Sequence, residues 1–260
     1  GTRIISPNEA SMTEVCLARF NAWSIREIGV TQTGHPKEEH TIRYSIDYPN
    51  YNDGIFQQNN LVTVPIEESF YTDGVLVKRL HHLHYKDSYI KPWKEYVHYN
   101  KEGYSFPPEF TGNVDQNLGV PELIYSSYSA NGQAVSMQTR QGRSVVLIWG
   151  YQGQHIIAQI DGSSLEEVKS QGIVPDLIAS REEPTEEDWR LLNQLRSRLP
   201  NAQVVTTRYE PLVGIVSQTD ARGVTYRYTY DEFNRLCEVI ETGEQEHVLR
   251  KTEYKYATEY

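Results

Sequence analysis

Several things are scarce in this sequence of 260 residues, and each scarcity removes a class of protein. Its two cysteines, Cys16 and Cys237, lie far apart and make no disulfide framework; they could form one disulfide or stay as two buried thiols. No apolar run approaches the roughly 20 residues that a membrane-spanning helix requires. The net charge of −10 argues against a nucleic-acid or anionic-membrane partner, because phosphates attract Lys and Arg.

Signatures of catalysis are also missing. There is no Gly-x-Ser-x-Gly elbow, and neither cysteine has neighbours that would activate a thiolate. The 35 Asp and Glu residues are numerous enough for the paired acids of a glycoside hydrolase, but sequence alone cannot place two of them across a cleft. We therefore predict no catalytic residue and no cofactor, and we keep a glycoside hydrolase as the weakest alternative.

Phenylalanine is scarce beside tyrosine, with 6 Phe against 19 Tyr. Tyrosine suits strands whose faces are half wet, because its ring is apolar and its hydroxyl group can reach a partner or solvent. A long sheet of repeated hairpins explains this bias better than a compact enzyme core. The intervals from Tyr128 to Tyr151 and from Tyr230 to Tyr254 are nearly equal, which indicates a loosened internal repeat.

Strand patterns fill the first half of the chain. Residues 41–48 alternate, which would place Ile42, Tyr44, Ile46 and Tyr48 on one face. Residues 61–66 form a second expected strand, in which Pro65 indicates a sheet edge. A third expected strand covers residues 75–85, after the turn signal Asp73-Gly74. Residues 14–23 fit a strand or a short helix, and we favour a strand.

The second half alternates between hairpins and helices. Strands are expected at 123–129, 135–139, 144–149, 156–160 and 204–209, with turns at Asn131-Gly132 and Gln141-Gly142. Ser163 or Ser164 can cap one short helix. Thr185 can cap a longer helix in a capping box with Asp188. That helix carries an apolar stripe of Trp189, Leu192, Leu195 and Leu199. Residues 161–202 are therefore predicted to be a helical insertion between hairpins.

The most informative stretch lies near the C-terminus. Tyr226, Tyr228 and Tyr230 alternate with Arg227 and Thr229, as in a half-buried strand. Asp231 and Asn234 then supply turn chemistry, because Asp bonds its own backbone and Asn tolerates positive φ. An apolar pattern restarts at Leu236.

This stretch resembles the YD repeat of the rearrangement-hotspot (RHS) family, which runs Gly, a few residues, then Tyr-x-Tyr-Asp-x-x-Gly-Arg-Leu. The matching residues here are Gly223, Tyr228, Tyr230, Asp231, Arg235 and Leu236, with Asn234 in the place of the turn glycine. Residues 148–160 resemble the degenerate repeats of Bacteroidetes members, and residues 211–223 are similar to the usual lead-in to a YD unit in those members. The resemblance is strongest over residues 120–260.

The resemblance implies a mainly β fold in which consecutive antiparallel hairpins form an extended twisted sheet. Four segments are expected: a β-rich region with degenerate repeats (1–120), YD-like hairpins (121–160), the helical insertion (161–202) and YD-repeat hairpins (203–260). In the family such repeats wind into a shell around a cargo domain. Larger members end in a self-cleaving segment and a toxin, and nothing similar follows Tyr256.

Three groups of residues are candidate sites. Trp93, Trp149, Tyr151, Tyr226 and Tyr228 could stack on sugar rings, or they could pack against each other across strands. His82 and His84 would share a strand face, with His81 on the other, and could form half of a metal site or simply face solvent. Asp231 could contact a ligand or calcium, or serve only the turn.

The expected function is that of a structural or interaction fragment of a secreted or cell-surface RHS protein. A carbohydrate- or surface-binding module is the alternative. Partners would be a carbohydrate or another segment of a larger RHS protein, and an unfinished repeat could dimerise through its sheet edge. The chain shows no secretory signal, and Gly1 suggests a trimmed start, so we expect that the native gene could encode one.

Overall fold

The structure is a computed structural model that describes residues 2–5, 15–21, 24–31, 36–61, 63–86, 90–242, 247–252 and 254. It is mainly β, as predicted, and each strand pairs with the next one along the chain in antiparallel fashion. The chain divides into two compact units, Gly1–Tyr125 and Ser126–Tyr260. The predicted division into four segments stays a prediction.

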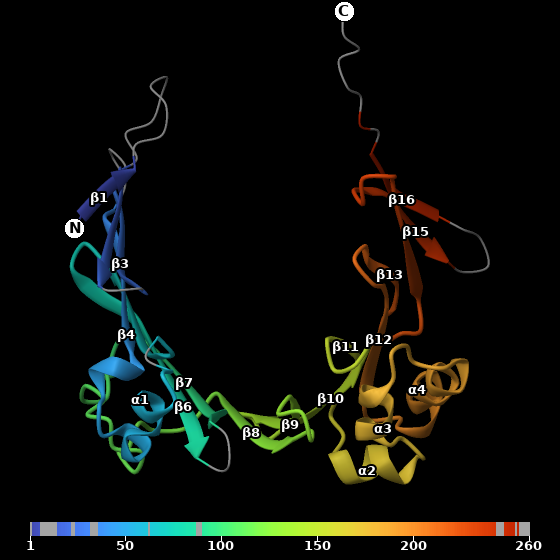
Figure 1. Ribbon diagram of the computed structural model, residues 1–260, viewed down its shortest axis with the longest axis horizontal. Helices are drawn as coiled ribbons and strands as arrows, with labels where there is room; N and C mark the ends of the chain where they lie inside the picture. Colours follow the sequence, from blue (N-terminus) through green and yellow to red (C-terminus); the bar gives the residue numbers. More distant parts are fainter. Residues whose placement is uncertain are drawn as a thin grey trace, which may run out of the picture. The chain divides into compact units, whose positions relative to one another are not determined.

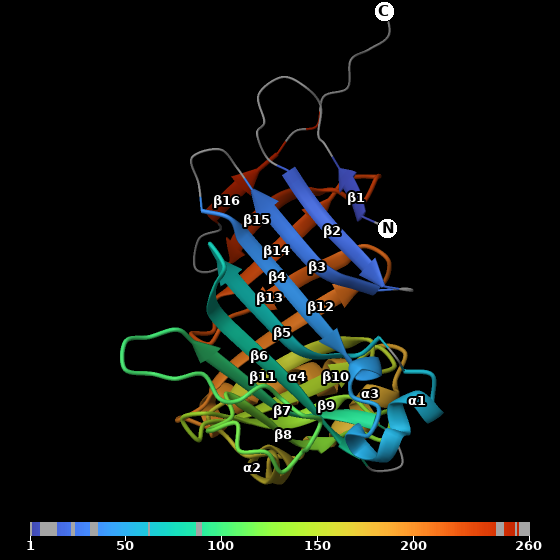
Figure 2. The same ribbon diagram turned by 90° about the vertical axis from the view of Figure 1, so that its left-hand side faces the viewer.

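The N-terminal unit is a run of antiparallel strands in chain order, visible side by side in Figure 2. Val15–Asn21 is a strand, as we favoured. The strands are β1 (Thr2–Ile5), β2 (Val15–Asn21), β3 (Ser24–Thr31), β4 (Glu38–Tyr44), β5 (Pro65–Thr72), β6 (Val75–Lys86), β7 (Ile90–Tyr99) and the beginning of β8 (Leu123–Tyr128). Asp73 and Gly74 both have positive φ, so the β5–β6 turn is the tight hairpin that their sequence predicts.

One strand of this unit is shorter than predicted. Strand β4 ends at Tyr44, and the 3₁₀ helix η1 (Ser45–Asp47) replaces the expected continuation to residue 48. The Asp47 carboxylate accepts the Tyr44 N–H at 2.8 Å, and Ser45 is buried against a different segment, with its N–H donated to the Val64 carbonyl. Ile46 therefore points to solvent instead of sharing a face with Tyr44. A local polar cap thus overrides an alternating pattern.

The expected strand at 61–66 is also displaced. Strand β5 begins at Pro65 and pairs with both β4 and β6, so it is an interior strand and not an edge. A proline at the first position of a strand needs to donate no ladder hydrogen bond, which reconciles it with this place. Before it come the short helices η2 (Tyr51–Gly54) and α1 (Ile55–Gln58). Phe56 of α1 packs in an apolar cluster with Leu83 of β6.

The C-terminal unit continues with hairpins around a helical insertion. Its strands after β8 are β9 (Ala134–Thr139), β10 (Ser144–Gly150), β11 (His155–Asp161), β12 (Gln203–Glu210), β13 (Gly214–Thr219), β14 (Thr225–Tyr230), β15 (Leu236–Thr242) and β16 (His247–Lys251). Cys237 on β15 is a free, half-buried thiol, and the side chain of Cys16 lies outside the described residues.

The predicted insertion contains three helices, α2 (Leu165–Ser170), α3 (Pro175–Ser180) and α4 (Glu186–Arg198). Ser164 caps α2, and Thr185 caps α4 in the predicted box with Asp188. Figure 1 shows the three helices gathered beside strands of their own unit. Within the described residues, no helix combines the length and the apolar character needed to cross a bilayer.

The stripe on α4 packs into the core of this unit. Trp189, Leu192 and Leu195 are buried against Val146, Ile148, Ile160 and Val204 of the sheet, and Leu199 packs at the margin. Burial of a leucine side chain contributes about 2 kcal/mol relative to its exposure. The helices therefore hold β10–β12 more firmly than they hold the hairpins that follow.

Candidate functional site

Four hairpin turns of the C-terminal unit share one pattern. Each begins with a residue whose side chain carries an oxygen, and a residue with positive φ follows three positions later: Ser129 and Gly132, Thr139 and Gly142, Asp220 and Gly223, Asp231 and Asn234. The first residue donates its N–H to the carbonyl of the residue four positions on, and the positive-φ residue donates back, at 2.8–3.0 Å. This is a type I turn closed by a left-handed residue.

The first side chain of each turn secures the loop. Asp231 Oδ1 accepts the N–H groups of Phe233 and Arg235, both at 2.9 Å, and Asp220 makes the same pair of bonds in its turn. The Arg235 side chain also donates to Asp231 Oδ2 at 2.7 Å, and this bond is the main reason why the pKa of Asp231 lies below its ordinary value. The acid of the motif is thus occupied by the backbone and side chain of its own turn.

Tyrosine hydroxyl groups join one strand to its neighbours. Tyr230 donates to the carbonyl oxygen of Ile215 at 2.8 Å, and Tyr254 donates to that of Leu236 at 3.2 Å. Tyr151 donates to the Tyr209 carbonyl at 2.8 Å and accepts the Tyr209 N–H at 3.1 Å. These bonds need a hydroxyl group, which explains why the sequence prefers tyrosine to phenylalanine. Tyr228 lies half-buried opposite Val239.

Helix α4 is bonded to this hairpin region through Arg196. Its guanidinium group donates to the carbonyl oxygens of Asp220 and Thr219, at 3.1 and 3.0 Å, and to Thr206 Oγ1 at 3.0 Å. Burial lowers the pKa of Arg196 from its ordinary value. The sequence gives no signal that Arg196 reaches the turn before the motif strand.

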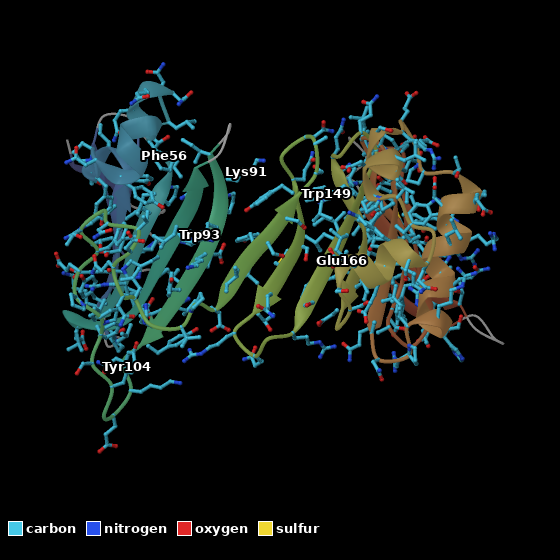
Figure 3. All side chains as sticks on the ribbon, turned by 90° about the horizontal axis from the view of Figure 1, so that it is seen from below. Phe56, Lys91, Trp93, Tyr104, Trp149 and Glu166 are labelled. Atoms are coloured by element: carbon cyan, nitrogen blue, oxygen red, sulfur yellow. The ribbon has the colours of Figure 1, made fainter. Side chains whose placement is uncertain are left out.

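The N-terminal unit carries a buried polar cluster on the face of β5–β7 that lies beneath the loop following β7. We call this the covered face; its buried polar residues are Glu67, Ser69, Arg79, His81 and His98. His81 is fully buried and donates from Nε2 to Glu67 Oε2 at 3.1 Å, and Phe110 of the loop packs on its ring. Tyr104 of the same loop, labelled in Figure 3, hydrogen-bonds His98 Nδ1 at 2.8 Å.

Neighbouring side chains stabilise the negative charge of Glu67. Burial alone raises the pKa of this carboxyl, but the His81 hydrogen bond and the charges of His81, Arg79 and Arg43 outweigh burial and lower it. Glu67 is therefore an ionised side chain inside the unit. Because the loop covers the cluster, the polar groups of the cluster stabilise the fold more directly than they could bind a ligand.

The opposite side of the same strands, which we call the open face, carries a row of four side chains directly across from one another on β4, β5, β6 and β7: His40, Phe70, Lys78 and Tyr99. The rings of His40 and Phe70 stack at 4.1 Å. A groove of about 520 Å³ runs over this row and is also lined by Glu38, Glu39, Tyr71, Thr72 and Val77. Sequence reasoning missed this row, because alternation within a strand says nothing about register between strands.

Of the five aromatic residues predicted to face a ligand, one is buried and four are half-buried. Trp93 on β7 and Trp149 on β10, both labelled in Figure 3, pack against the cores of their units. The Trp149 indole donates to the Ala134 carbonyl at 2.7 Å. Tyr151 is buried, and Tyr226 is half-buried with its hydroxyl accepting from Arg222 at 3.3 Å. Tyr151 therefore offers no free ring face in this structure.

The two histidines of the predicted pair, His82 and His84, make different contacts. His82 donates to Glu68 at 3.0 Å, and His40 donates to the other oxygen of Glu68 at 2.8 Å. The His84 ring instead packs edge-on against Phe56 at 5.4 Å, beyond a bulge at Leu83 and His84 in the pairing with β7. Among the described residues, no group of three His, Cys, Asp or Glu side chains is arranged to hold a metal ion.

Consecutive hairpins with a recurring turn and tyrosine bonds between strands define a β-hairpin repeat protein. Residues 214–245 match the family model described as RHS Repeat. These residues include Tyr228, Tyr230, Asp231, Asn234 and Arg235, so the chain carries an RHS repeat and the expected resemblance is confirmed there. No comparison supports the narrower resemblance to Bacteroidetes members. A search of curated proteins gave no match.

Solved structures with a similar arrangement contain the proteins TcdB2 and TccC3. One is a crystal structure of TcdB2-TccC3 without the hypervariable C-terminal region, with 13% identity, a TM-score of 0.38 and 92% of this chain covered. Another is TcdB2-TccC3-Cdc42, with 12% identity, a TM-score of 0.36 and 90% of this chain covered. A third is a Photorhabdus luminescens Tc holotoxin pore with a TccC3 mutation, with 12% identity, a TM-score of 0.34 and 93% covered. This chain spans 12% of the length of each of those chains.

Proposed function

We propose that this chain is a non-catalytic structural segment of a larger RHS protein, in which its sheet acts as a scaffold or a piece of a shell. The observation that carries the proposal is the recurrence of one turn design at Ser129, Thr139, Asp220 and Asp231, with each strand paired to its chain neighbour. Such a sheet grows by adding hairpins, and each hairpin depends mainly on its neighbours. A secreted or cell-surface location is part of the same proposal.

A second feature supports a structural role for the repeat. The signature residues are used by the protein itself: Asp231 by its own turn, Tyr230 by β13, and Arg235 by Asp231 and the Tyr254 ring, 4.0 Å away. None of these contacts needs a substrate. The partner of the segment in this proposal is another part of a larger RHS protein.

Hydrogen exchange of the whole chain tests the scaffold proposal. Asp231→Ala removes the acceptor of two backbone N–H groups, so we expect faster exchange in β13–β16. Strands β10–β12 should keep their protection, because the helices pack on them. Glu232→Ala, an exposed change in the same turn, is the matched control and should leave exchange unchanged.

The location of the faster hydrogen exchange in Asp231→Ala decides whether the scaffold proposal holds. Faster exchange that stays near the altered turn is the behaviour of a scaffold with nearest-neighbour coupling. An equal rise over all strands, including β4–β7, would show a single cooperative domain and contradict the proposal.

The carbohydrate-binding alternative has its own test. A glycan array probed with the wild type, Trp149→Ala and Tyr228→Ala would reveal binding that depends on these aromatics. The half-buried positions of both side chains favour a negative result. Reproducible binding that either substitution abolishes would replace the scaffold proposal with a binding module.

Self-association through a sheet edge is a further part of the proposal. All five residues of β16 are exposed, and Val248 and Leu249 contribute apolar surface there. Exposed strands with apolar side chains tend to pair with another chain. Light scattering should therefore show a dimer as concentration rises, and a strictly monomeric chain would contradict this part.

A further inference from the structure

We propose that the groove on the open face of the N-terminal unit binds a carboxylate carried on a ring. The groove follows the row of His40, Phe70, Lys78 and Tyr99, and its volume of about 520 Å³ lies within the range of sites that hold small ligands. The site goes beyond the scaffold role, and it uses none of the residues of the RHS repeat.

The cation of the site is held between two rings. Lys78 Nζ lies 5.2 Å from the centre of the Phe70 ring and 5.8 Å from that of Tyr99. Lys101 Nζ lies 5.7 Å from the same Tyr99 ring. These contacts orient the ammonium groups and replace part of their hydration, which reduces what a ligand must displace.

Neither lysine is neutralised by a residue that the structure describes. Among the residues that the structure describes, no carboxylate lies within 4.0 Å of the ammonium group of Lys78 or Lys101. The acids at the other end of the groove are partly engaged, because Glu39 forms an ion pair with Lys37. Charge complementarity thus calls for an anion at the Tyr99 end.

The rings determine what should carry that anion. Tyr99 is 48% exposed, so it keeps open surface beside the two ammonium groups, and the imidazole of His40 lies flat on Phe70. Such surfaces suit the flat face of an aromatic ring or the apolar face of a sugar ring. The net charge of −10 opposes a long polyanion, which leaves a single carboxylate as the better match.

A neighbouring groove on the same unit shows the contrast. It measures about 250 Å³ and is lined by Glu68, Glu95, His82 and His84, among others. Each groove is lined by two glutamates, but the lining of this one includes no lysine, whereas Lys78 lines the proposed site and can attract an anion. The proposed ligand therefore discriminates between the two grooves by charge.

The test is an NMR titration of the ¹⁵N-labelled whole chain with two acids and their neutral counterparts. The aromatic pair is indole-3-acetate and indole-3-acetamide, and the sugar pair is D-galacturonate and D-galactose. We expect shifts at residues of the row with a dissociation constant on the order of 1 mM, as for an efficient small ligand. Whichever acid binds more tightly identifies the source of the carboxylate.

Three variants locate the contacts. Lys78→Gln should weaken the binding of the acid about three- to fivefold and leave the neutral counterpart unaffected, since a partly exposed ion pair contributes modestly. Tyr99→Ala should weaken both members of a pair. Lys169→Gln, an exposed lysine of α2, is the control and should change nothing.

The proposal is overturned if neither acid shifts the row at about 20 mM, which is far above the expected constant. It is also overturned if the neutral counterparts bind as tightly as the acids, or if Lys78→Gln binds like the wild type while its spectrum stays folded. Each of these results would leave the scaffold proposal standing, because that rests on hydrogen exchange in the other unit.

Discussion

The Tyr230 hydroxyl group reaches the carbonyl oxygen of Ile215 at 2.8 Å because Gly214, the residue before it, has no side chain. A Cβ atom at Gly214 would lie 3.0 Å from Tyr230 Oη, and its φ of +143° is one that other residues rarely adopt. The tyrosine of the repeat and this glycine are therefore complementary. Together they fasten β14 to β13.

Loss of this hydroxyl group should be measurable. Tyr230→Phe keeps the ring but leaves the Ile215 carbonyl without its donor, so we expect a loss of about 1 kcal/mol in the free energy of unfolding. Urea denaturation followed by circular dichroism would measure it. The control is Tyr226→Phe, because the Tyr226 hydroxyl group only accepts a long bond from the exposed Arg222. Equal losses in both variants would refute a special role for Tyr230.

The turn residue Asn234 gives a second prediction. Its φ is +57°, where an alanine is strained by roughly 1 kcal/mol and a glycine is not. Asn234→Ala should therefore lower the denaturation midpoint, whereas Asn234→Gly, which restores the glycine of the family pattern, should hold or raise it. Both variants lose the 3.3 Å bond from Asn234 Nδ2 to Leu212, so the difference between them isolates the backbone effect. A glycine variant less stable than the alanine variant would contradict it.

Sequence reasoning succeeded where the causes are local. The Asp231 turn, the Thr185 cap and the stripe of α4 each depend on residues a few positions apart, and all three were predicted. It was wrong at residues 45–48, where alternation continues but Ser45 is drawn to Val64, a partner that the pattern cannot reveal.

Arg196 carries the third prediction. Arg196→Met retains the apolar stem but removes three charge-assisted hydrogen bonds, to the carbonyl groups of Asp220 and Thr219 and to Thr206 Oγ1. We expect a loss of about 2 kcal/mol in the free energy of unfolding. Faster hydrogen exchange should appear in the turn between β13 and β14. Arg190→Met, an exposed position on the same helix, should leave the midpoint unchanged.

Adjacent glutamates on opposite faces of β5 give a matched pair. Glu67→Gln would leave the buried Arg79 and His81 without their counter-charge, so we expect a loss of about 2–4 kcal/mol. Glu68→Gln affects a partly exposed group and should reduce stability by less than about 1 kcal/mol. Thermal and urea unfolding of both variants would compare them. A larger loss of stability in Glu68→Gln than in Glu67→Gln would mean that the buried charge on the covered face does not stabilise the fold more than the partly exposed one.

Both candidate sites of the N-terminal unit escaped prediction for one reason. Glu67 meets His81, and Phe70 meets Lys78, only because β5 and β6 pair in one particular register. A slip by one residue would exchange the two faces of a strand. The composition of each strand was readable from the sequence, but its partner across the sheet was not.

The last prediction concerns pH and His84. Burial lowers the pKa of His84 from its ordinary value of 6.5 to about 4, and the charge of His82 acts in the same direction. Between these two values the unfolded chain binds a proton that the folded chain does not, so stability falls as pH falls. The contribution is fully present above pH 6.5, and about 2 kcal/mol of it is lost at pH 5.

Replacement of the imidazole isolates this effect from the other histidines. His84→Phe keeps a ring against Phe56, 5.4 Å away in the wild type, but cannot take up a proton. Urea unfolding at pH 7.5 and pH 5 should therefore show a smaller loss of stability in this variant than in the wild type. His247→Gln, at an exposed position on β16, should retain the wild-type difference. If His84→Phe loses as much stability on acidification as the wild type does, then the buried imidazole is not the group that senses pH in this range.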